Sequence, residues 1–271
     1  MVFNRINPPN AEPKMLKNKT FVIGDVHGCI CELQELMEKL SPSTQDRLIF
    51  IGDLIDRGPD SLAVVRTVVQ WSKQLKVQLI LGNHEEKFLR YMQHIRTGSG
   101  REKEMQGIKE FPTLLDGLGD EELRFLEAAY YTLHLPESNT LLVHGGLWQS
   151  IDFPLPVTYE FGENHKVDKK RLALLTMTRY LNAEGNFLAL GQEKTGDSFW
   201  AEEYHGQWGH VFFGHQPFLQ AELKKFPHAT GIDTGCVFGG WLSAVEITGE
   251  AVKSHSVSAR KIYATQNKAS K

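Results

Sequence analysis

Three short apolar runs in the first third of the chain each end in a glycine that is followed by side chains able to bind metal ions. The runs cover residues 21–23, 48–51 and 77–81 and lead into Gly24-Asp25-Val26-His27-Gly28, Gly52-Asp53-Leu54-Ile55-Asp56-Arg57-Gly58 and Gly82-Asn83-His84-Glu85. Runs rich in Val and Ile are typical of buried strands in a parallel sheet, and ligands of such sheets gather at the carboxyl ends of the strands. The pattern therefore predicts a metal site at one edge of a sheet.

Two later strands are also predicted to end at a histidine. Residues 140–143 run into His144-Gly145-Gly146, and residues 211–213 run into Gly214-His215-Gln216-Pro217. The candidate ligands are Asp25, His27, Asp53, Asn83, His144 and His215. Oxygen and imidazole ligands without a thiolate favour Mn²⁺, Fe or Zn²⁺ over Ca²⁺ or a structural zinc. If Asp53 bridges two ions about 3.5–4 Å apart, the pair forms the clamp used in metal-assisted phosphoryl transfer, with a shared water or hydroxide as nucleophile.

Taken together and in this order, the motifs resemble those of the calcineurin-like metallophosphoesterases, and within them the phosphoprotein phosphatase branch, over roughly residues 20–250. Within this branch, the chain resembles a bacterial or phage-type serine/threonine phosphatase, related to bacterial diadenosine tetraphosphatases, more than a eukaryotic catalytic subunit. The resemblance implies an α/β fold of two packed mixed β-sheets flanked by helices, in four layers α/β/β/α. It also implies two divalent ions, the first held by Asp25, His27 and Asp53 and the second by Asp53, Asn83, His144 and His215. Manganese is the expected metal, with Fe, Zn, Ni and Co as alternatives.

The same resemblance implies a catalytic pair and a phosphate-binding group. His84 would be the general acid that protonates the leaving oxygen, and Asp56 would keep its imidazole oriented and protonated. Arg57 would bind a non-bridging phosphate oxygen in a bidentate manner, a task for which Lys is a poor substitute. Arg179, which lies between the two later histidine motifs, is the predicted second phosphate arginine, and Asn83 would contact the phosphate as well as a metal.

Two substrate classes remain open. Asp56 directly before Arg57 is typical of the protein phosphatases and favours phosphomonoesters, above all phosphoserine and phosphothreonine in proteins, with phosphotyrosine as a further option. The segments 200–204, 214–217 and 232–240 instead look like small bacterial phosphatases, some of which cleave dinucleoside polyphosphates such as diadenosine tetraphosphate. Hydrolysis of phosphoproteins is the preferred prediction, and hydrolysis of dinucleoside polyphosphates at the same metal site is the alternative.

Particular residues would distinguish the dinucleotide hydrolase, and a protein without activity, from the preferred prediction. The dinucleotide alternative would be favoured by aromatic and basic residues around Trp148, Tyr159 and Trp200 that converge on a base-sized cleft. A catalytically silent binding protein would be expected to have lost metal ligands or the general acid. Because none of these residues is missing, the sequence favours an enzyme.

Periodicity outside the motifs predicts helices over residues 30–40, from Pro59 to about residue 75, and over 85–95, 120–129 and 167–181. Asp120 is expected to be the N-cap of the fourth helix. Residues 97–119 are expected to form a loop-rich cover over the metal edge, and strand 241–247 is expected in a second sheet packed on the first. The predicted layout is a flexible leader at 1–19, a catalytic domain at 20–254, and a polar tail at 255–271 that frays.

Composition limits the choice of partner and compartment. A net charge of -3 gives no basic surface, so a phosphorylated protein or a nucleotide is expected as partner and nucleic acid is not. The sequence shows neither a secretory signal nor a run of about 18 apolar residues, which favours a cytoplasmic protein without a membrane span, as a monomer or small homo-oligomer. Cys29, Cys31 and Cys236 form an odd set and are expected to be reduced structural thiols. Asp233 is expected near the site as a turn residue.

Overall fold

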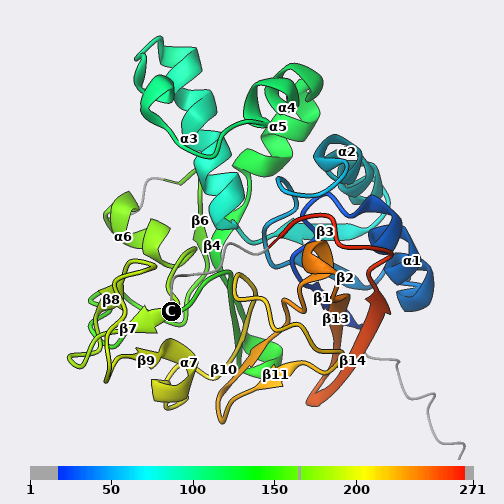
Figure 1. Cartoon of the computed structure of the whole chain (residues 1–271). Coiled ribbons are helices and arrows are strands. Elements are labelled where there is room, and N and C mark those ends of the chain that lie inside the picture. Colours follow the sequence, from blue (N-terminus) through cyan, green and yellow to red (C-terminus); the bar gives the residue numbers. More distant parts are fainter. Residues whose placement is uncertain (1–17, 164–165, 266–271) are drawn as a thin grey trace, which may run out of the picture.

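A computed structural model describes residues 18–163 and 166–265 of the chain. Two β-sheets form its centre, and helices cover them on the outside (Figure 1). The first sheet has the strand order β14-β13-β1-β2-β3, and the second has the order β11-β12-β10-β5-β4-β6. Each sheet combines parallel and antiparallel pairs. This architecture confirms the predicted α/β fold of packed mixed sheets flanked by helices.

The first sheet consists of β1 (Thr20–Ile23), β2 (Arg47–Phe50), β3 (Lys76–Leu79), β13 (Trp241–Thr248) and β14 (Ala251–Ser258). The second consists of β4 (Tyr130–Leu135), β5 (Thr140–Val143), β6 (Tyr159–Glu160), β10 (His210–Phe213), β11 (Lys224–Lys225) and β12 (Ala229–Gly231). A small third sheet contains β7 (Tyr180–Leu181), β8 (Phe187–Leu188) and β9 (Ser198–Phe199). The helices are α1 (Ile30–Leu40), α2 (Ser61–Ser72), α3 (Asn83–Thr97), α4 (Phe111–Gly117), α5 (Asp120–Glu127), α6 (Lys169–Leu174) and α7 (Trp200–Glu203).

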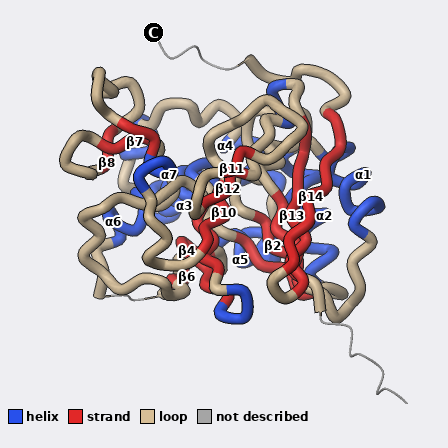
Figure 2. Tube along the Cα trace, turned by 90° about the horizontal axis from the view of Figure 1, so that it is seen from below, coloured by secondary structure: helices blue, strands red, loops and turns tan. Residues whose placement is uncertain are grey.

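Alternation along the strands divides the core into an inner and an outer layer. Val22, Ile49 and Phe212 point into a cluster shared by the two large sheets. Their neighbours Phe21 and Phe50 belong to the larger cluster that also contains the apolar faces of the helices. In the view of Figure 2, α1 and α2 lie on one side of the strands, and α6 and α7 lie on the other. Because successive side chains point to opposite faces, burial on both faces fixes the register of each strand.

The C-terminal strands differ from the prediction. Strand β13 lies in the first sheet, antiparallel to β1, with Thr20 opposite Ile247, so the prediction of a second-sheet strand at 241–247 is wrong. The expected fraying after Ser254 is also wrong for the residues that follow, because β14 pairs with β13 as far as Ser258. Beyond it, the Tyr263 and Ala264 N–H groups donate to the carbonyl of Val237. Residue 254 therefore lies inside a paired strand, at the outer edge of the first sheet.

Three helical predictions need correction. Only α6 forms within the helix predicted over 167–181. The helix ends there because the Leu175 carbonyl accepts from the Gly145 and Gly146 N–H groups, and the chain then turns towards β7. Gly119, not Asp120, occupies the N-cap of α5, where its N–H donates to Glu122 Oε2 at 2.9 Å. The segment predicted as loop-rich, 97–119, contains α4 and a 3₁₀ turn at Arg101–Glu104.

Within the described ranges, no helix is both long enough and apolar enough to cross a bilayer. The leader predicted at 1–19 falls almost entirely on residues 1–17, and the end of the predicted tail falls on 266–271, both outside the described residues. The division into leader, domain and tail stays a prediction.

Candidate metal centre

The carboxyl ends of strands from both large sheets bring the predicted ligands to one shared edge. Two ligands follow β1, one follows β2, one begins α3 just after β3, one follows β5 and one follows β10, in the order Asp25, His27, Asp53, Asn83, His144 and His215. All of these side chains are buried except that of Asn83, which is half-buried. Residues up to 190 positions apart in the chain meet here, since the His215 N–H donates to Asp25 Oδ2 at 3.0 Å.

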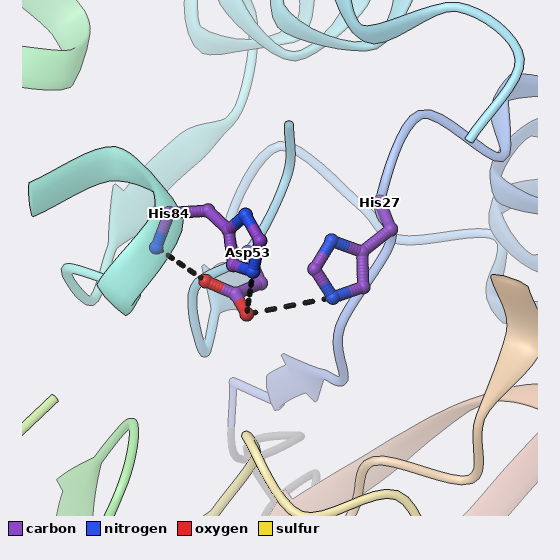
Figure 3. Close-up of side chains that lie close together, drawn as sticks. All are labelled: His27, Asp53 and His84. Atoms are coloured by element: carbon purple, nitrogen blue, oxygen red, sulfur yellow. Dashed lines mark hydrogen bonds and ion pairs between the residues drawn. The ribbon is translucent and has the colours of Figure 1, made fainter. Parts of the chain in front are cut away.

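Asp53 lies at the centre of this group. Its Oδ2 atom is 3.4 Å from Nε2 of His27 and 3.3 Å from Nε2 of His144. Figure 3 shows the rings of His27 and His84 directed at the Asp53 carboxylate, with His84 Nε2 at 3.9 Å. The ligand atoms of Asp53, His144 and His215 also lie within 4.8 Å of one another. Two groups of potential ligands therefore share one carboxylate.

The donor set fits divalent cations. His27 donates from Nδ1 to the Ile55 carbonyl at 2.9 Å, so a neutral ring turns the lone pair of Nε2 towards the Asp53 carboxylate. Two acceptors facing each other repel unless a positive group lies close to them, and here Arg57 supplies one by donating from Nη1 to His27 Nε2 at 3.0 Å. Asp25 Oδ1, in contrast, is buried and has no hydrogen-bond partner among the described residues. An unpaired buried carboxylate oxygen is costly, and a cation at this edge would satisfy it.

Electrostatics at this edge favour positive charge. Burial lowers the pKa of His27 to about 3, which keeps its imidazole neutral, the form that binds metals. At His144, burial acts in the same direction, but the charges of Asp53 and Asp25 outweigh it and raise the pKa to about 9. His144 also donates from Nδ1 to the Ile51 carbonyl at 2.8 Å. A bound cation can take the place of the proton that this negative potential attracts to Nε2.

Several of these side chains lie on backbone in the left-handed region. The φ angles are 45° at His27, 51° at Asp53, 71° at Asp56, 72° at Arg57 and 63° at His215. Such conformations cost of the order of 1–3 kcal/mol each for residues with a Cβ atom, and they cluster at functional sites. The surrounding structure must therefore hold the loops in place.

Glu85 holds the Asp53 loop, a role that its position in the sequence does not indicate. Its carboxylate accepts the N–H groups of Asp53 at 2.7 Å, Leu54 at 2.8 Å and Ile55 at 3.2 Å. Burial, and then the charge of Asp53, raise the pKa of Glu85 to about 7. In the sequence, Glu85 is marked only by its place directly after Asn83 and His84. An acidic residue in the first turn of a helix usually has a simpler role, which is to interact favourably with the helix dipole.

We expect Glu85→Gln to weaken both folding and metal binding. The amide would point an N–H group at a backbone N–H, and leaving a buried donor unsatisfied costs about 1–3 kcal/mol. Urea unfolding and metal analysis would measure the two effects. The matched control is Glu86→Gln, because Glu86 is the next residue of α3 and its carboxylate pairs with Arg90 at 3.5 Å, away from the Asp53 loop. Equal behaviour of the two variants would contradict the role given to Glu85.

Asp233 lies beside the metal edge, where the sequence predicted a turn residue. Its Oδ1 accepts the Gly235 N–H at 2.9 Å, and the side chain is buried. Burial, together with the charge of Asp53, raises the pKa of Asp233 to about 6. The charge of Asp233 in turn helps burial to raise the pKa of Asp25 well above its ordinary value. Asp233 therefore adds to the negative potential that favours a cation.

His84 and Asp56 form a close pair at the solvent side of the site. His84 Nδ1 donates to Asp56 Oδ2 at 2.6 Å, and the His84 backbone N–H donates to Asp53 Oδ1 at 3.1 Å. Burial alone would raise the pKa of Asp56, but the hydrogen bond and charge of His84 outweigh it and hold that pKa below its usual value. The pair fixes the His84 ring with Nε2 directed at the metal edge, as a proton donor at this position requires.

Both predicted arginines reach the same edge. Arg57 is exposed, and its Nη1 donates to His27 Nε2 at 3.0 Å. Arg179 donates from Nη2 to the His215 carbonyl at 2.8 Å, while its buried Nε has no partner in the part of the chain that the structure describes. Burial, and then the charge of Arg57, lower the pKa of Arg179. Two neighbouring guanidinium groups therefore border the site, an arrangement suited to a multiply charged phosphate.

The aromatic cleft that the dinucleotide alternative called for is not formed by the expected residues. Trp148, Tyr159 and Trp200 are core side chains, with 4 %, 7 % and 1 % of their surface exposed. The cavity beside Trp148 and Trp200 measures about 20 Å³, room for about one water molecule and not for a base. Sequence position near the motifs could not show that these rings fill the core.

The chain is similar to nucleotide hydrolases over most of its length. It is 31% identical over 244 residues to the asymmetrical bis(5'-nucleosyl)-tetraphosphatase PrpE of Oceanobacillus iheyensis, covering 83% of this chain and 87% of that protein. It is 30% identical over 265 residues to the symmetrical bis(5'-nucleosyl)-tetraphosphatase of Coxiella burnetii, covering 84% and 88%. A crystal structure assigned provisionally as a diadenosine tetraphosphatase superposes with a TM-score of 0.64 at 26% identity, over 90% of this chain and 96% of the other.

Family membership follows from a match to a family model. Residues 19–240 match the sequence model of the calcineurin-like phosphoesterases, a family of metal-dependent hydrolases of phosphoester bonds. The match contains every motif on which the resemblance was based, from Gly24 to His215. The chain therefore belongs to the calcineurin-like metallophosphoesterase family.

Proposed function

We propose that the protein hydrolyses dinucleoside polyphosphates, with diadenosine tetraphosphate as the representative substrate. The observation that carries this proposal is the similarity, over more than four fifths of the chain, to bis(5'-nucleosyl)-tetraphosphatases of both the asymmetrical and the symmetrical class. A tetraphosphate bridge carries several negative charges, and the two arginines beside the acidic metal edge provide the opposite charge that it needs.

In this proposal, Asp25, His27 and Asp53 hold one divalent ion, and Asp53, Asn83, His144 and His215 hold another. Manganese remains the expected metal. When bound, such a pair of ions neutralises developing charge and lowers the pKa of water. Arg57 and Arg179, with the Asn83 amide, orient the phosphate. His84 transfers a proton from Nε2 to the leaving oxygen, and Asp56 holds the Nδ1 proton at 2.6 Å so that the ring keeps this orientation.

Hydrolysis of phosphoproteins is the second candidate function. The observation that favours it is Asp56 directly before Arg57, with its short hydrogen bond to His84. An alkoxide leaving group needs a proton more than a nucleoside phosphate does, so a strongly oriented acid suits a phosphoserine substrate. The curated relatives nevertheless favour the dinucleotide.

Product analysis separates the two functions. The purified, manganese-loaded protein would be given diadenosine tetraphosphate or a panel of phosphopeptides, each with and without a chelator. We expect faster, chelator-sensitive cleavage of the dinucleotide, to two ADP in a symmetrical enzyme or to ATP and AMP in an asymmetrical one. Release of phosphate from the peptides without cleavage of the dinucleotide would contradict the proposal and support the second candidate.

Phe238 is a partly exposed ring next to the phosphate-binding group. The guanidinium carbon of Arg57 lies 5.6 Å from its centroid. We expect Phe238→Ala to raise KM for the dinucleotide by about 5- to 150-fold, because stacking of a base on an aromatic side chain contributes about 1–3 kcal/mol. The KM for p-nitrophenyl phosphate, which has no base, is the control and should change little. An equal rise for both substrates would show that the ring only positions Arg57.

A further inference from the structure

A second cluster of potential metal ligands lies in the core beside the catalytic edge. Cys29 precedes the first residue of α1, Glu32 lies in the first turn of that helix, and Cys236 begins the 3₁₀ turn Cys236–Phe238. One ligand atom from each residue lies within 4.8 Å of the other two. The exposed fractions are 0 %, 0 % and 1 %, so the cluster is closed to bulk solvent.

Glu32 gives this cluster an unsatisfied charge. Its Oε1 accepts the Arg260 N–H and the Tyr263 hydroxyl, both at 2.8 Å. Its Oε2 is buried, and no other described residue forms a hydrogen bond with it. A carboxylate oxygen without a partner in the core costs several times the net worth of a hydrogen bond, so an interaction with a cation would relieve a real penalty.

We propose that Cys29, Glu32 and Cys236 bind a thiophilic divalent cation of the zinc class, separate from the ions of the catalytic edge. Two thiolates and a carboxylate are ligands that zinc prefers. On binding, each thiol releases its proton to solvent and its sulfur bonds to the cation, with no change of oxidation state. The six predicted catalytic ligands include no sulfur, so the two sites differ in chemistry.

Such an ion would join three separate segments. Cys29 lies two residues after His27, Cys236 lies three residues after Asp233, and Glu32 contacts the C-terminal segment through Arg260 and Tyr263. The site would therefore fix two loops of the catalytic edge to α1 and to the end of the fold. It does not depend on which phosphate ester the enzyme cleaves.

Cobalt substitution tests the proposal, because thiolate-bound Co²⁺ has a charge-transfer band in the near ultraviolet that oxygen and imidazole ligands do not produce. We expect this band in the full-length protein loaded with Co²⁺. It should persist in Asp53→Asn, which alters only the catalytic edge, and in the matched control Cys31→Ser, whose thiol lies outside the cluster. It should be lost in Cys236→Ser and in Cys29→Ser.

Several results would overturn the site. These are the absence of the band from the unmodified protein, its survival in both cluster variants, or a thiol titration of the purified protein that shows Cys29 and Cys236 joined as a disulfide. Circular dichroism identifies a variant that fails to fold. The measurement on the unmodified protein decides the matter even if both cysteine variants unfold, and it requires no activity.

Discussion

Replacing His84 by Asn should lower turnover of diadenosine tetraphosphate by about two to four orders of magnitude, the usual contribution of a general acid. The metal content should stay unchanged, because His84 is not one of the predicted ligands and its hydrogen bond to Asp53 Oδ1, at 3.1 Å, comes from the backbone N–H, which Asn retains. Steady-state kinetics and metal analysis on the same preparation would measure both quantities.

The leaving group provides the control for this variant. p-Nitrophenolate and a nucleoside phosphate are both weakly basic leaving groups, whereas the alkoxide of an alkyl phosphate needs the proton more, so hydrolysis of an alkyl phosphate should depend more on His84 than hydrolysis of p-nitrophenyl phosphate. An equal loss for these two phosphomonoesters would point to a disturbed site in place of a missing acid. Unchanged turnover of the dinucleotide would contradict the assigned role outright.

Replacing Asp53 by Asn should remove metal and activity together. Its carboxylate faces Nε2 of His27 and Nε2 of His144 within 3.4 Å, and a neutral amide cannot screen two cations at that position. Residues that only orient ligands typically contribute 10- to 100-fold in metal affinity, so loss of a bridging ligand should exceed about 100-fold. Metal titration and turnover measure the effect.

Asp60→Asn is the matched control for Asp53→Asn. Asp60 is exposed and caps α2 by accepting the Ala63 N–H at 2.8 Å, a role in which Asn is equally good. Its metal content and activity should match those of the unmodified protein. If Asp53→Asn still bound two ions per chain, the bridging assignment would be wrong.

The strands that carry the site could be predicted because each ends with a local signal, an apolar run before a glycine or a histidine. That local signal does not show which strand lies next to which in a sheet. Strand β13 pairs with β1 across more than 220 residues, with Thr20 opposite Ile247, and an alternating pattern fits either sheet. The helix predicted over 167–181 failed for a related reason, since the Leu175 carbonyl bonds to a loop that follows a distant strand. Long-range hydrogen bonds decided both cases.

In the candidate site, too, local features could be predicted and long-range contacts could not. Residue types after the strands were enough to propose which residues gather at one edge, and in the structure the Asp25 carboxylate accepts the His215 backbone N–H. Glu85 has its role only through three backbone N–H groups of another loop, which no sequence spacing reveals. The place of Trp200 could not be predicted, because an aromatic residue near a motif can line a cleft or fill the core, and only packing distinguishes the two.

The central claim, that two divalent ions share Asp53, is tested most directly by anomalous diffraction from crystals of the full chain grown with Mn²⁺. We predict two manganese peaks on either side of the Asp53 carboxylate, one contacted by Asp25 and His27 and the other by Asn83, His144 and His215. A single peak, or two peaks of which one does not contact Asp53, would contradict the account.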